Sequence, residues 1–344
     1  MKKPNAPAEK SKKAISPLGI MDMASAFYDS CVLFTASDLG IFAKLSELGR
    51  ADSDIIAGKC GLNRRATRLL LDACAALGLL LKEGSLYSNA PETEAFLVPG
   101  SPADLSRAIR YNRDVYPAWG KLGEFLRTGE PVERPEIHLG EDPERTRTFV
   151  LSMHSRALGI GRAVLPFLDL SGRKKLLDVG GGPGTYSMLI ARRNPEIECT
   201  VLDLPEVVRV ADELIQAEKM QDRVKTLAGD YHALTFPSHN DVVNFFGVLH
   251  QESENFIISL LRKAHNAMVS GGIIHVLDMM TDATRTRPKF SSLFAVNMGL
   301  TAQHGWVFSD TDLKSWLSEA GFAEFACRPL PPPMPHWLVS ARRP

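Results

Sequence analysis

The residues Gly180, Gly181, Gly182 and Gly184 are the first whose type and spacing indicate chemistry. They follow a short apolar run, and a helical pattern begins directly after them. Glycine tolerates positive φ and lets a ligand approach the backbone closely, and ligands bind where a strand turns into a helix. The pattern G-G-G-P-G lacks the third glycine that packs a helix beside a pyrophosphate in the dinucleotide fingerprint. The turn therefore predicts a site for a nucleoside without phosphates, rather than a turn with no ligand.

Two acidic residues follow the next two apolar runs. Asp203 ends the run at 198–203, where a carboxylate can accept hydrogen bonds from both hydroxyls of a ribose. Asp230 ends a third run, where it can accept from an adenine amino group, with Tyr231 beside the ring. A glycine-rich turn alone is a weak signal, but its combination with these side chains predicts an adenosine site.

The elements that must position these residues alternate between strand and helix from residue 175 onward. Strand patterns are KLLDVG (175–180), ECTVLD (198–203), VKTLAGD (224–230), DVVNFFGVLH (241–250), GGIIHVLDMM (271–280) and WLVSARR (337–343). Helical patterns are TYSMLIARRN (185–194), PEVVRVADELIQAEK (205–219), ENFIISLLRKAHNAM (254–268) and SDTDLKSWLSEAGF (309–322), the last with Ser309 as a cap. This order predicts an α/β fold with a doubly wound, mostly parallel, Rossmann-like sheet.

The N-terminal part has a different pattern. Helical spacing over residues 18–48, 52–58 and 63–78 is followed by LLLKEGSLYSNA, which predicts two short strands around a Glu-Gly turn. Helix, helix, helix and hairpin form a winged-helix arrangement, which in some proteins binds DNA. Here the third helix begins with Arg64, Arg65 and Arg68 but is otherwise almost wholly apolar. We therefore expect burial against another helix or subunit instead of nucleic acid.

The length and composition of the chain also indicate two domains. A chain of 344 residues with zero formal net charge, 44% apolar and 23% charged residues is typical of a globular protein of two domains. No apolar run approaches the ~20 residues of a bilayer span, so no membrane partner is expected. Five scattered cysteines without a C-x-x-C pair favour a reducing, cytoplasmic setting. The predicted boundaries are a disordered tail at 1–15, a winged-helix domain at 16–100, a helical connector at 101–172 and the Rossmann-like domain at 173–344.

Four segments together resemble one enzyme family. LLDVGGGPGTYS, VLDLPEVV, GDYHALTFP and VLHQESE are similar to motifs of the S-adenosylmethionine-dependent O-methyltransferases of the plant caffeate and bacterial acetylserotonin type. The resemblance runs from about residue 18 to the C-terminus and implies a homodimer formed through the winged-helix domain. It also implies that S-adenosylmethionine is held by a set of turn and strand-end residues. These are Gly180, Gly182, Gly184, Asp203, Leu204, Asp230 and Tyr231.

The resemblance also implies a general base. His250 matches the family's catalytic histidine, and Asp278 matches the first of two carboxylates that flank it. A histidine titrates near neutral pH and can take the proton of a phenol while its oxygen attacks the cofactor methyl group. The sequence departs from the family at several positions. Gln251 and Glu252 replace an Asp-Trp pair, and Phe246 aligns with a cofactor-binding lysine. The position of the second carboxylate falls near Val307, where this chain has no acid.

The acceptor site is predicted less sharply. Family segments that line it contain Met153, Phe294, Met298 and His304, together with Phe290 and Trp306, and favour a flat aromatic, lipophilic or polyketide-like acceptor. Two alternatives stay open. One is methyl transfer to carbon or nitrogen, for example on an α-keto acid, with a metal held by His250 and His304. The other is an inactive cofactor-binding or DNA-binding regulator.

Overall fold

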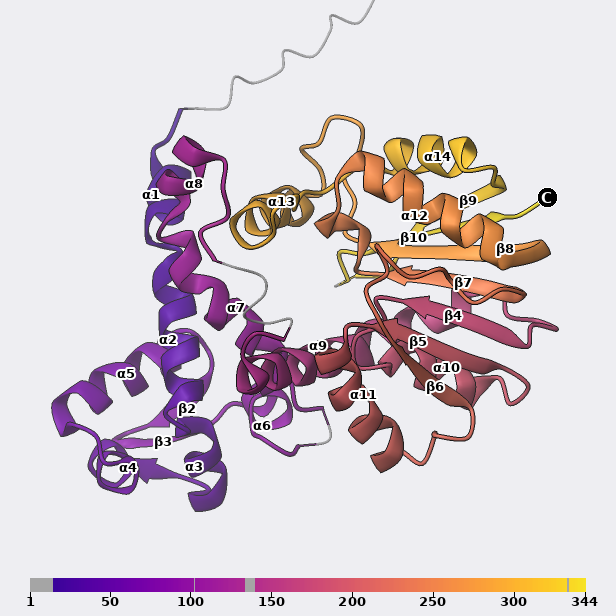
Figure 1. Ribbon diagram of the computed structural model, residues 1–344. Helices are drawn as coiled ribbons and strands as arrows, with labels where there is room; N and C mark the ends of the chain where they lie inside the picture. Colours follow the sequence, from indigo (N-terminus) through magenta and orange to yellow (C-terminus); the bar gives the residue numbers. More distant parts are fainter. Residues whose placement is uncertain (1–14, 102, 134–139, 333) are drawn as a thin grey trace, which may run out of the picture. The chain divides into compact units, whose positions relative to one another are not determined.

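The computed structural model describes residues 15–101, 103–133, 140–332 and 334–344, so all but the last residue of the predicted tail lies outside the described residues. The chain divides into two compact units, the first ending at Ser106 and the second beginning at Arg107 (Figure 1). Among the described residues, no helix combines the length and the apolar character that crossing a membrane requires.

The first unit combines short helices with a small antiparallel sheet in the order β1-β3-β2. Its elements are α1 (Leu18–Ser25), α2 (Phe27–Asp38), α3 (Ile41–Leu48), β1 (Ala51–Asp52), α4 (Ser53–Cys60), α5 (Arg64–Ala76), β2 (Leu80–Glu83), β3 (Leu86–Asn89) and α6 (Pro91–Phe96). The predicted helix at 18–48 is interrupted, because Gly40 adopts a left-handed conformation between α2 and α3. The predicted hairpin is present as β2 and β3.

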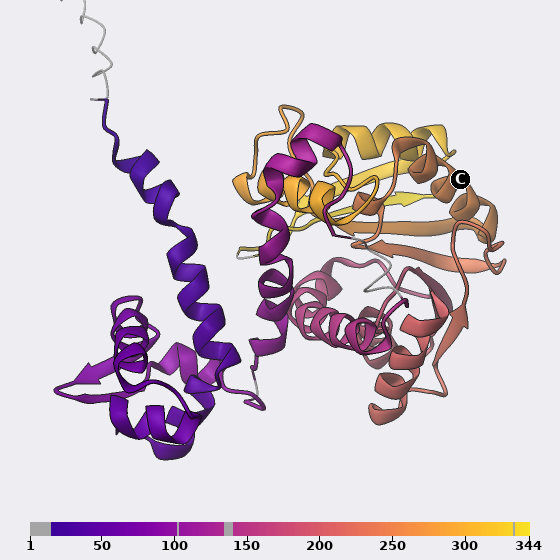
Figure 2. The ribbon, with the colours of Figure 1, turned by 60° about the vertical axis from the view of Figure 1, so that its left-hand side comes forward.

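The N-terminal helices of this unit expose apolar side chains. No residue of α1 is buried, and α1 continues the line of α2 away from the small sheet (Figures 1 and 2). Large side chains that are more than half exposed include Leu18, Ile20, Met21, Met23 and Tyr28. A contiguous apolar surface of this kind is typical of a protein–protein contact.

The second unit is built on a seven-stranded sheet in the order β6-β5-β4-β7-β8-β10-β9. Its strands are β4 (Lys175–Val179), β5 (Glu198–Asp203), β6 (Val224–Ala228), β7 (Asn240–Phe246), β8 (Met268–Asp278), β9 (Ala323–Pro329) and β10 (Trp337–Arg342). The first five run parallel, whereas β10 pairs antiparallel with β8 and β9. The strand order reverses direction between β4 and β7, and in such sheets the ligand binds beyond the carboxyl ends of the strands at that point.

Helices cover both faces of this sheet (Figure 1). The helical elements are α7 (Ser106–Trp119), α8 (Leu122–Thr128), α9 (Pro143–Val164), η2 (Leu165–Phe167), α10 (Thr185–Arg193), α11 (Pro205–Ala217), η3 (Leu249–Gln251), α12 (Glu254–Ala267), α13 (Lys289–Thr301) and α14 (Asp310–Glu319). Successive residues of β4 point to opposite faces: Leu176 packs in a cluster with α10 and α11, and Leu177 packs in one with α12 and α14. The predicted doubly wound α/β fold is confirmed.

In the second unit, one helix cap was predicted from the sequence and one strand was not. Ser309 caps α14 as predicted, in a capping box with Asp312. Strand β9 was not predicted, because most of its residues are half-buried or exposed and it lies at the edge of the sheet, where the hydrophobic alternation is weak.

Candidate active site

The glycine turn lies directly after β4, at the carboxyl edge of the sheet. Gly180 and Gly182 have φ values of +63° and +54°, which favour glycine. A Cβ atom at Gly180 would lie 2.6 Å from a methyl group of Val248, so this glycine allows the turn to pack against the segment after β7. A Cβ atom at Gly182 would have no atom within 4 Å, so the backbone there borders open space. The turn thus leaves its backbone open at Gly182, and the binding of a ligand there stays a prediction.

Hydrogen bonds to the Asp203 side chain connect this turn with the end of β5. Its Oδ2 accepts a hydrogen bond from the Gly182 N–H at 2.7 Å, and its Oδ1 accepts from the Leu204 N–H at 2.8 Å. Desolvation by burial raises the pKa of Asp203 to about 6, although both N–H donors favour the charged form. A carboxylate can accept about four hydrogen bonds, so acceptor capacity remains for the two hydroxyls of a ribose.

Asp178, on β4 beneath the turn, is a second buried carboxyl group that the sequence analysis left without a role. Its Oδ2 accepts a hydrogen bond from Ser187 Oγ at 2.7 Å, and its Oδ1 has no partner in the described part of the chain. Burial raises the pKa of Asp178 to about 7, and the nearby charge of Asp203 acts in the same direction. Among the described residues, no basic side chain pairs with the carboxyl group of Asp178 or Asp203, which suits a positively charged ligand.

The segment after β6 carries the residues that were predicted to lie beside an adenine. Asp230 is exposed, and its Oδ1 accepts from the His232 N–H and lies 2.8 Å from His232 Nδ1. The Tyr231 hydroxyl donates to Glu252 Oε1 at 2.7 Å, and His232 Nε2 lies 2.9 Å from Glu252 Oε2. Burial opposes the charged imidazolium, but Glu252 and Asp230 outweigh it and raise the pKa of His232.

Glu252 is the centre of this network. It is buried, and its backbone oxygen also accepts a hydrogen bond from the Trp306 indole at 2.8 Å. Glu252 and Gln251 stand where the family usually has an Asp-Trp pair, so here a carboxylate takes part in fixing Tyr231. The sequence analysis noted the replacement but missed Glu252 and His232 as site residues, since their pairing joins segments 20 residues apart.

His250 and Asp278 meet at the ends of the neighbouring strands β7 and β8. His250 Nδ1 lies 2.7 Å from Asp278 Oδ1, and both side chains are buried. Asp278 Oδ1 is itself fixed by the N–H of Met279 at 2.8 Å. Because a carboxylate accepts, this contact favours the tautomer with the proton on Nδ1, which leaves the Nε2 lone pair free to accept a proton. The pair has the arrangement of an oriented general base.

An apolar wall surrounds this pair. Met279, Phe294, Met298 and Val307 form one buried cluster, and the Phe294 ring packs edge-on against His250 with centroids 5.2 Å apart. Val307 lies inside this cluster, so in the described chain Asp278 is the carboxylate that orients His250.

The other predicted acceptor residues are placed less clearly. Phe290 stacks on Phe294 at 6.5 Å between centroids, and Met153 is half-buried on α9. His304 is exposed in the turn after α13, with no hydrogen bond or ring contact to the other site residues that the structure describes. Within the described ranges, no group of three or more His, Cys, Asp or Glu side chains is arranged to hold a metal ion. The His250–His304 metal alternative therefore gains no support.

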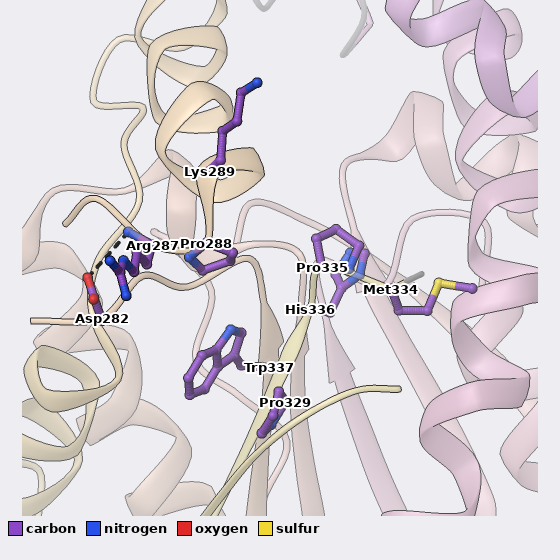
Figure 3. Close-up of a pocket in the computed structure, with 9 residues that line it drawn as sticks. All are labelled: Asp282, Arg287, Pro288, Lys289, Pro329, Met334, Pro335, His336 and Trp337. Carbon is purple, nitrogen blue, oxygen red and sulfur yellow. Dashed lines mark hydrogen bonds between the residues drawn. The ribbon is translucent and has the colours of Figure 1, made fainter. Parts of the chain in front are cut away.

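A pocket of about 670 Å³ opens beyond the ends of β8 and β10 (Figure 3). It is lined by Asp282, Arg287, Pro288, Lys289, Pro329, Met334, Pro335, His336 and Trp337. Trp337 pairs with Asp278 across the two strands, so His336 lies next to the level of the His250–Asp278 pair. The sequence analysis left His336 without a role, because only strand pairing brings it to this position.

Comparison with known proteins gives a consistent result along the whole chain. A family model for an O-methyltransferase domain matches residues 136–323, and a model for an O-methyltransferase dimerisation domain matches residues 21–99. The chain is 30% identical to the 3-hydroxy-5-methyl-1-naphthoate 3-O-methyltransferase of Streptomyces sahachiroi, with 90% of each chain covered. It is 28% identical to the N,N-dimethyltransferase OxyT of Streptomyces rimosus, with 94% and 96% covered. The structure of human N-acetylserotonin methyltransferase in complex with S-adenosylmethionine is similar with a TM-score of 0.86, at 27% identity and with 97% and 99% covered.

Proposed function

Because the chain belongs to the S-adenosylmethionine-dependent O-methyltransferase family, we propose that it methylates a hydroxyl group of an aromatic or polyketide-like small molecule with His250 as general base. The observation that carries this proposal is the position of two sites on one sheet edge. The glycine turn with Asp203 lies at the ends of β4 and β5, and the His250–Asp278 pair lies at the ends of β7 and β8.

The residues at the first site fit the cofactor. Asp203 would accept hydrogen bonds from the ribose hydroxyls, and the turn of Gly180, Gly182 and Gly184, with its backbone open at Gly182, would border the amino-acid part. Leu204, Asp230 and Tyr231 would surround the adenine, held in place by Glu252. The buried carboxyl groups of Asp178 and Asp203 favour a cation. When bound, S-adenosylmethionine supplies an electrophilic methyl group, which the acceptor oxygen takes as the carbon–sulfur bond breaks.

The residues at the second site would activate the acceptor. His250 Nε2 would take the hydroxyl proton, and Asp278 would stabilise the resulting imidazolium through Nδ1–H at 2.7 Å. The apolar cluster of Phe294, Met298 and Val307 would bind the flat face of the acceptor and exclude water. Met153 and His304 remain proposed acceptor residues at the margin of this site.

The first unit is proposed to form the homodimer through its winged-helix arrangement. The match to a dimerisation domain and the exposed apolar side chains of α1 and α2 support this role, and they favour a protein partner over nucleic acid or membrane. We also propose a cytoplasmic location, since all five cysteines are free thiols. Sedimentation of the full chain as a monomer would contradict the dimer.

A labelled-methyl transfer screen tests the proposed reaction. The panel contains phenols, quinols and hydroxynaphthoates, with amines and α-keto acids as competing classes. We expect transfer to a phenolic oxygen. The similarity to OxyT makes N-methylation the second candidate, and transfer to the amines alone would favour it. Binding of S-adenosylhomocysteine without transfer to any member, together with specific duplex binding in a shift assay, would favour a regulator instead.

A further inference from the structure

His232, in the segment after β6, lies between two carboxylates. Its Nδ1 is 2.8 Å from Asp230 Oδ1, and its Nε2 is 2.9 Å from Glu252 Oε2. An ionised carboxylate can only accept hydrogen bonds, and a neutral imidazole has a single N–H donor. Both contacts are hydrogen bonds only when both ring nitrogens carry a proton. The geometry therefore favours the imidazolium form of His232.

The charges around the ring act in the same direction. Burial opposes the imidazolium, but the hydrogen bond and charge of Glu252, together with Asp230, raise the pKa of His232. Glu252 is buried, and among the described residues His232 is the basic side chain that pairs with it. A second cation, Lys263 of α12, contacts this segment through the carbonyl oxygens of Tyr231 and His232, at 3.0 and 2.6 Å from its Nζ. A buried carboxylate without a counter-charge costs free energy, so loss of the imidazolium would leave Glu252 unpaired.

The contact joins two segments that are separated in the sheet. β6 and β7 are not neighbours, because β5 and β4 lie between them. His232 follows β6, whereas Glu252 follows η3, beyond the end of β7. The imidazole thus links the segments on either side of the strand ends that carry the glycine turn and Asp203, where the adenosine site is proposed.

Aromatic contacts fix the imidazole in place. Its ring centroid lies 4.5 Å from that of Tyr231 and 4.9 Å from that of Phe256, on α12. The Tyr231 hydroxyl donates to Glu252 Oε1 at 2.7 Å, so one buried carboxylate holds both rings. Tyr231, His232 and Glu252 therefore form one connected unit.

Asp230 has one carboxylate oxygen engaged and one open. Its Oδ1 accepts a hydrogen bond from the backbone N–H of His232 at 2.8 Å and also contacts the imidazole. Its Oδ2 has no hydrogen-bond partner in the described part of the chain, and the side chain is 50% exposed. Because Oδ1 is held by His232, the direction of Oδ2 is set as well. A fixed carboxylate oxygen is a strong acceptor for an N–H group such as the amino group of adenine.

Resting on the proposed function, which places adenine beside Asp230 and Tyr231, we propose that the His232 imidazolium is a positioning residue for the cofactor. It holds Asp230 toward the amino group of adenine and, through Glu252, holds Tyr231 beside the ring. The imidazole is 36% exposed, so its proton exchanges with solvent. Affinity for the adenosine part is therefore full below the raised pKa of His232 and falls as the pH rises through it.

The test measures binding of 5′-methylthioadenosine, which lacks the titrating amino-acid part of the cofactor, by calorimetry in wild type and His232→Gln. At about pH 6 we expect the variant to bind about fivefold more weakly, comparable to the loss of about one hydrogen bond. At about pH 9 the two Kd values should agree within about 1.5-fold, because His232 of wild type has then lost its charge. Comparison at one pH cancels the titration of Asp178 and Asp203, which both proteins share. The exposed His239→Gln, also between β6 and β7, is the matched control and should follow wild type at both pH values.

A second probe addresses Asp230 directly. 5′-Methylthioinosine carries a carbonyl oxygen in place of the adenine amino group, so a carboxylate held in this direction should reject it. At about pH 6 we expect wild type to prefer 5′-methylthioadenosine about tenfold, and H232Q about threefold or less. Glu252→Gln removes the charge on the other side of the contact and should show the same pH-dependent loss, which keeps the test available if H232Q does not fold.

Three results would overturn the inference. A loss in H232Q that is equal at both pH values would assign His232 to packing alone. Equal binding by H232Q and wild type at about pH 6 would place the imidazole outside the adenosine site. Weaker binding with an unchanged preference for the adenine probe would show that His232 does not position Asp230. If wild type binds neither probe, the proposed adenosine site itself fails, which is a separate outcome.

Discussion

The two halves of the active site are built in different ways. The cofactor half, at the ends of β4, β5 and β6, consists of backbone turns and of acids at or just beyond the strand ends. The acceptor half, at the ends of β7 and β8, consists of side chains from α9, α13, η3 and the segment before β10. The first half has the geometry for one fixed ligand, whereas the second can change by substitution of single side chains. Under the proposed function, the cofactor half would hold the cofactor and the acceptor half would set the specificity.

The sharpest test of this comparison removes the base from the acceptor half. His250→Ala should lower kcat by about 10³-fold, because a positioned general base contributes roughly 10²–10⁴-fold. Calorimetry should show unchanged binding of S-adenosylhomocysteine, since His250 contacts Asp278 and Phe294 and has no hydrogen bond to the glycine turn. Turnover equal to that of wild type in a variant that binds normally would remove His250 from the mechanism.

A substitution of Asp203 tests the cofactor half. Asp203→Ala should raise the Kd of S-adenosylhomocysteine about 100-fold, because it removes two hydrogen bonds to a charged group and loosens the Gly182 backbone. The exposed Asp222→Ala serves as control. Affinity within about twofold of wild type would show that the ribose lies elsewhere.

The electrostatic cost of the cofactor half can be measured in the absence of ligand. The pKa of Asp178 is raised to about 7, so its contribution to stability is present below about pH 4 and is lost as the pH rises through 7. Between pH 5 and pH 8, the free energy of unfolding of wild type, measured in urea, should therefore fall by about 2 kcal/mol more than that of Asp178→Asn. Asp222→Asn should follow wild type, and parallel pH profiles for wild type and D178N would contradict the raised pKa.

The smallest effect is expected at the boundary between the halves. Glu252→Gln keeps one acceptor for Tyr231 but weakens the ion pair with His232. We expect cofactor affinity to fall about fivefold, comparable to the loss of about one hydrogen bond, with kcat unchanged. The exposed Glu196→Gln is the control. A large loss in kcat for E252Q would place Glu252 in the acceptor half instead.

The residues of the cofactor half carry local signals, so the sequence could nominate them, and their role stays a prediction. Gly180 directly follows β4, Asp203 is the last residue of β5 and Asp230 lies just beyond β6, and the parallel pairing of these strands brings the three ends together. The His250–Asp278 pairing was also expected, from the family resemblance; Asp278 ends β8, whereas His250 lies in η3, beyond the end of β7. Glu252 and His336, which lie near these residues in the structure, were not among the predicted site residues. They come from different elements, and no periodicity connects a residue of η3's flank with one before β10.

The sequence by itself determined the alternation of strands and helices, the glycine turn and the carboxylates after the strands, because these depend on neighbouring residues and on the two-residue and 3.6-residue periods. Only the tertiary structure decided which polar groups are buried without partners. Desolvation and pairing depend on atoms that are distant in sequence, so the raised pKa of Asp178 and the unpaired Nδ1 of His336 follow from packing and not from residue type.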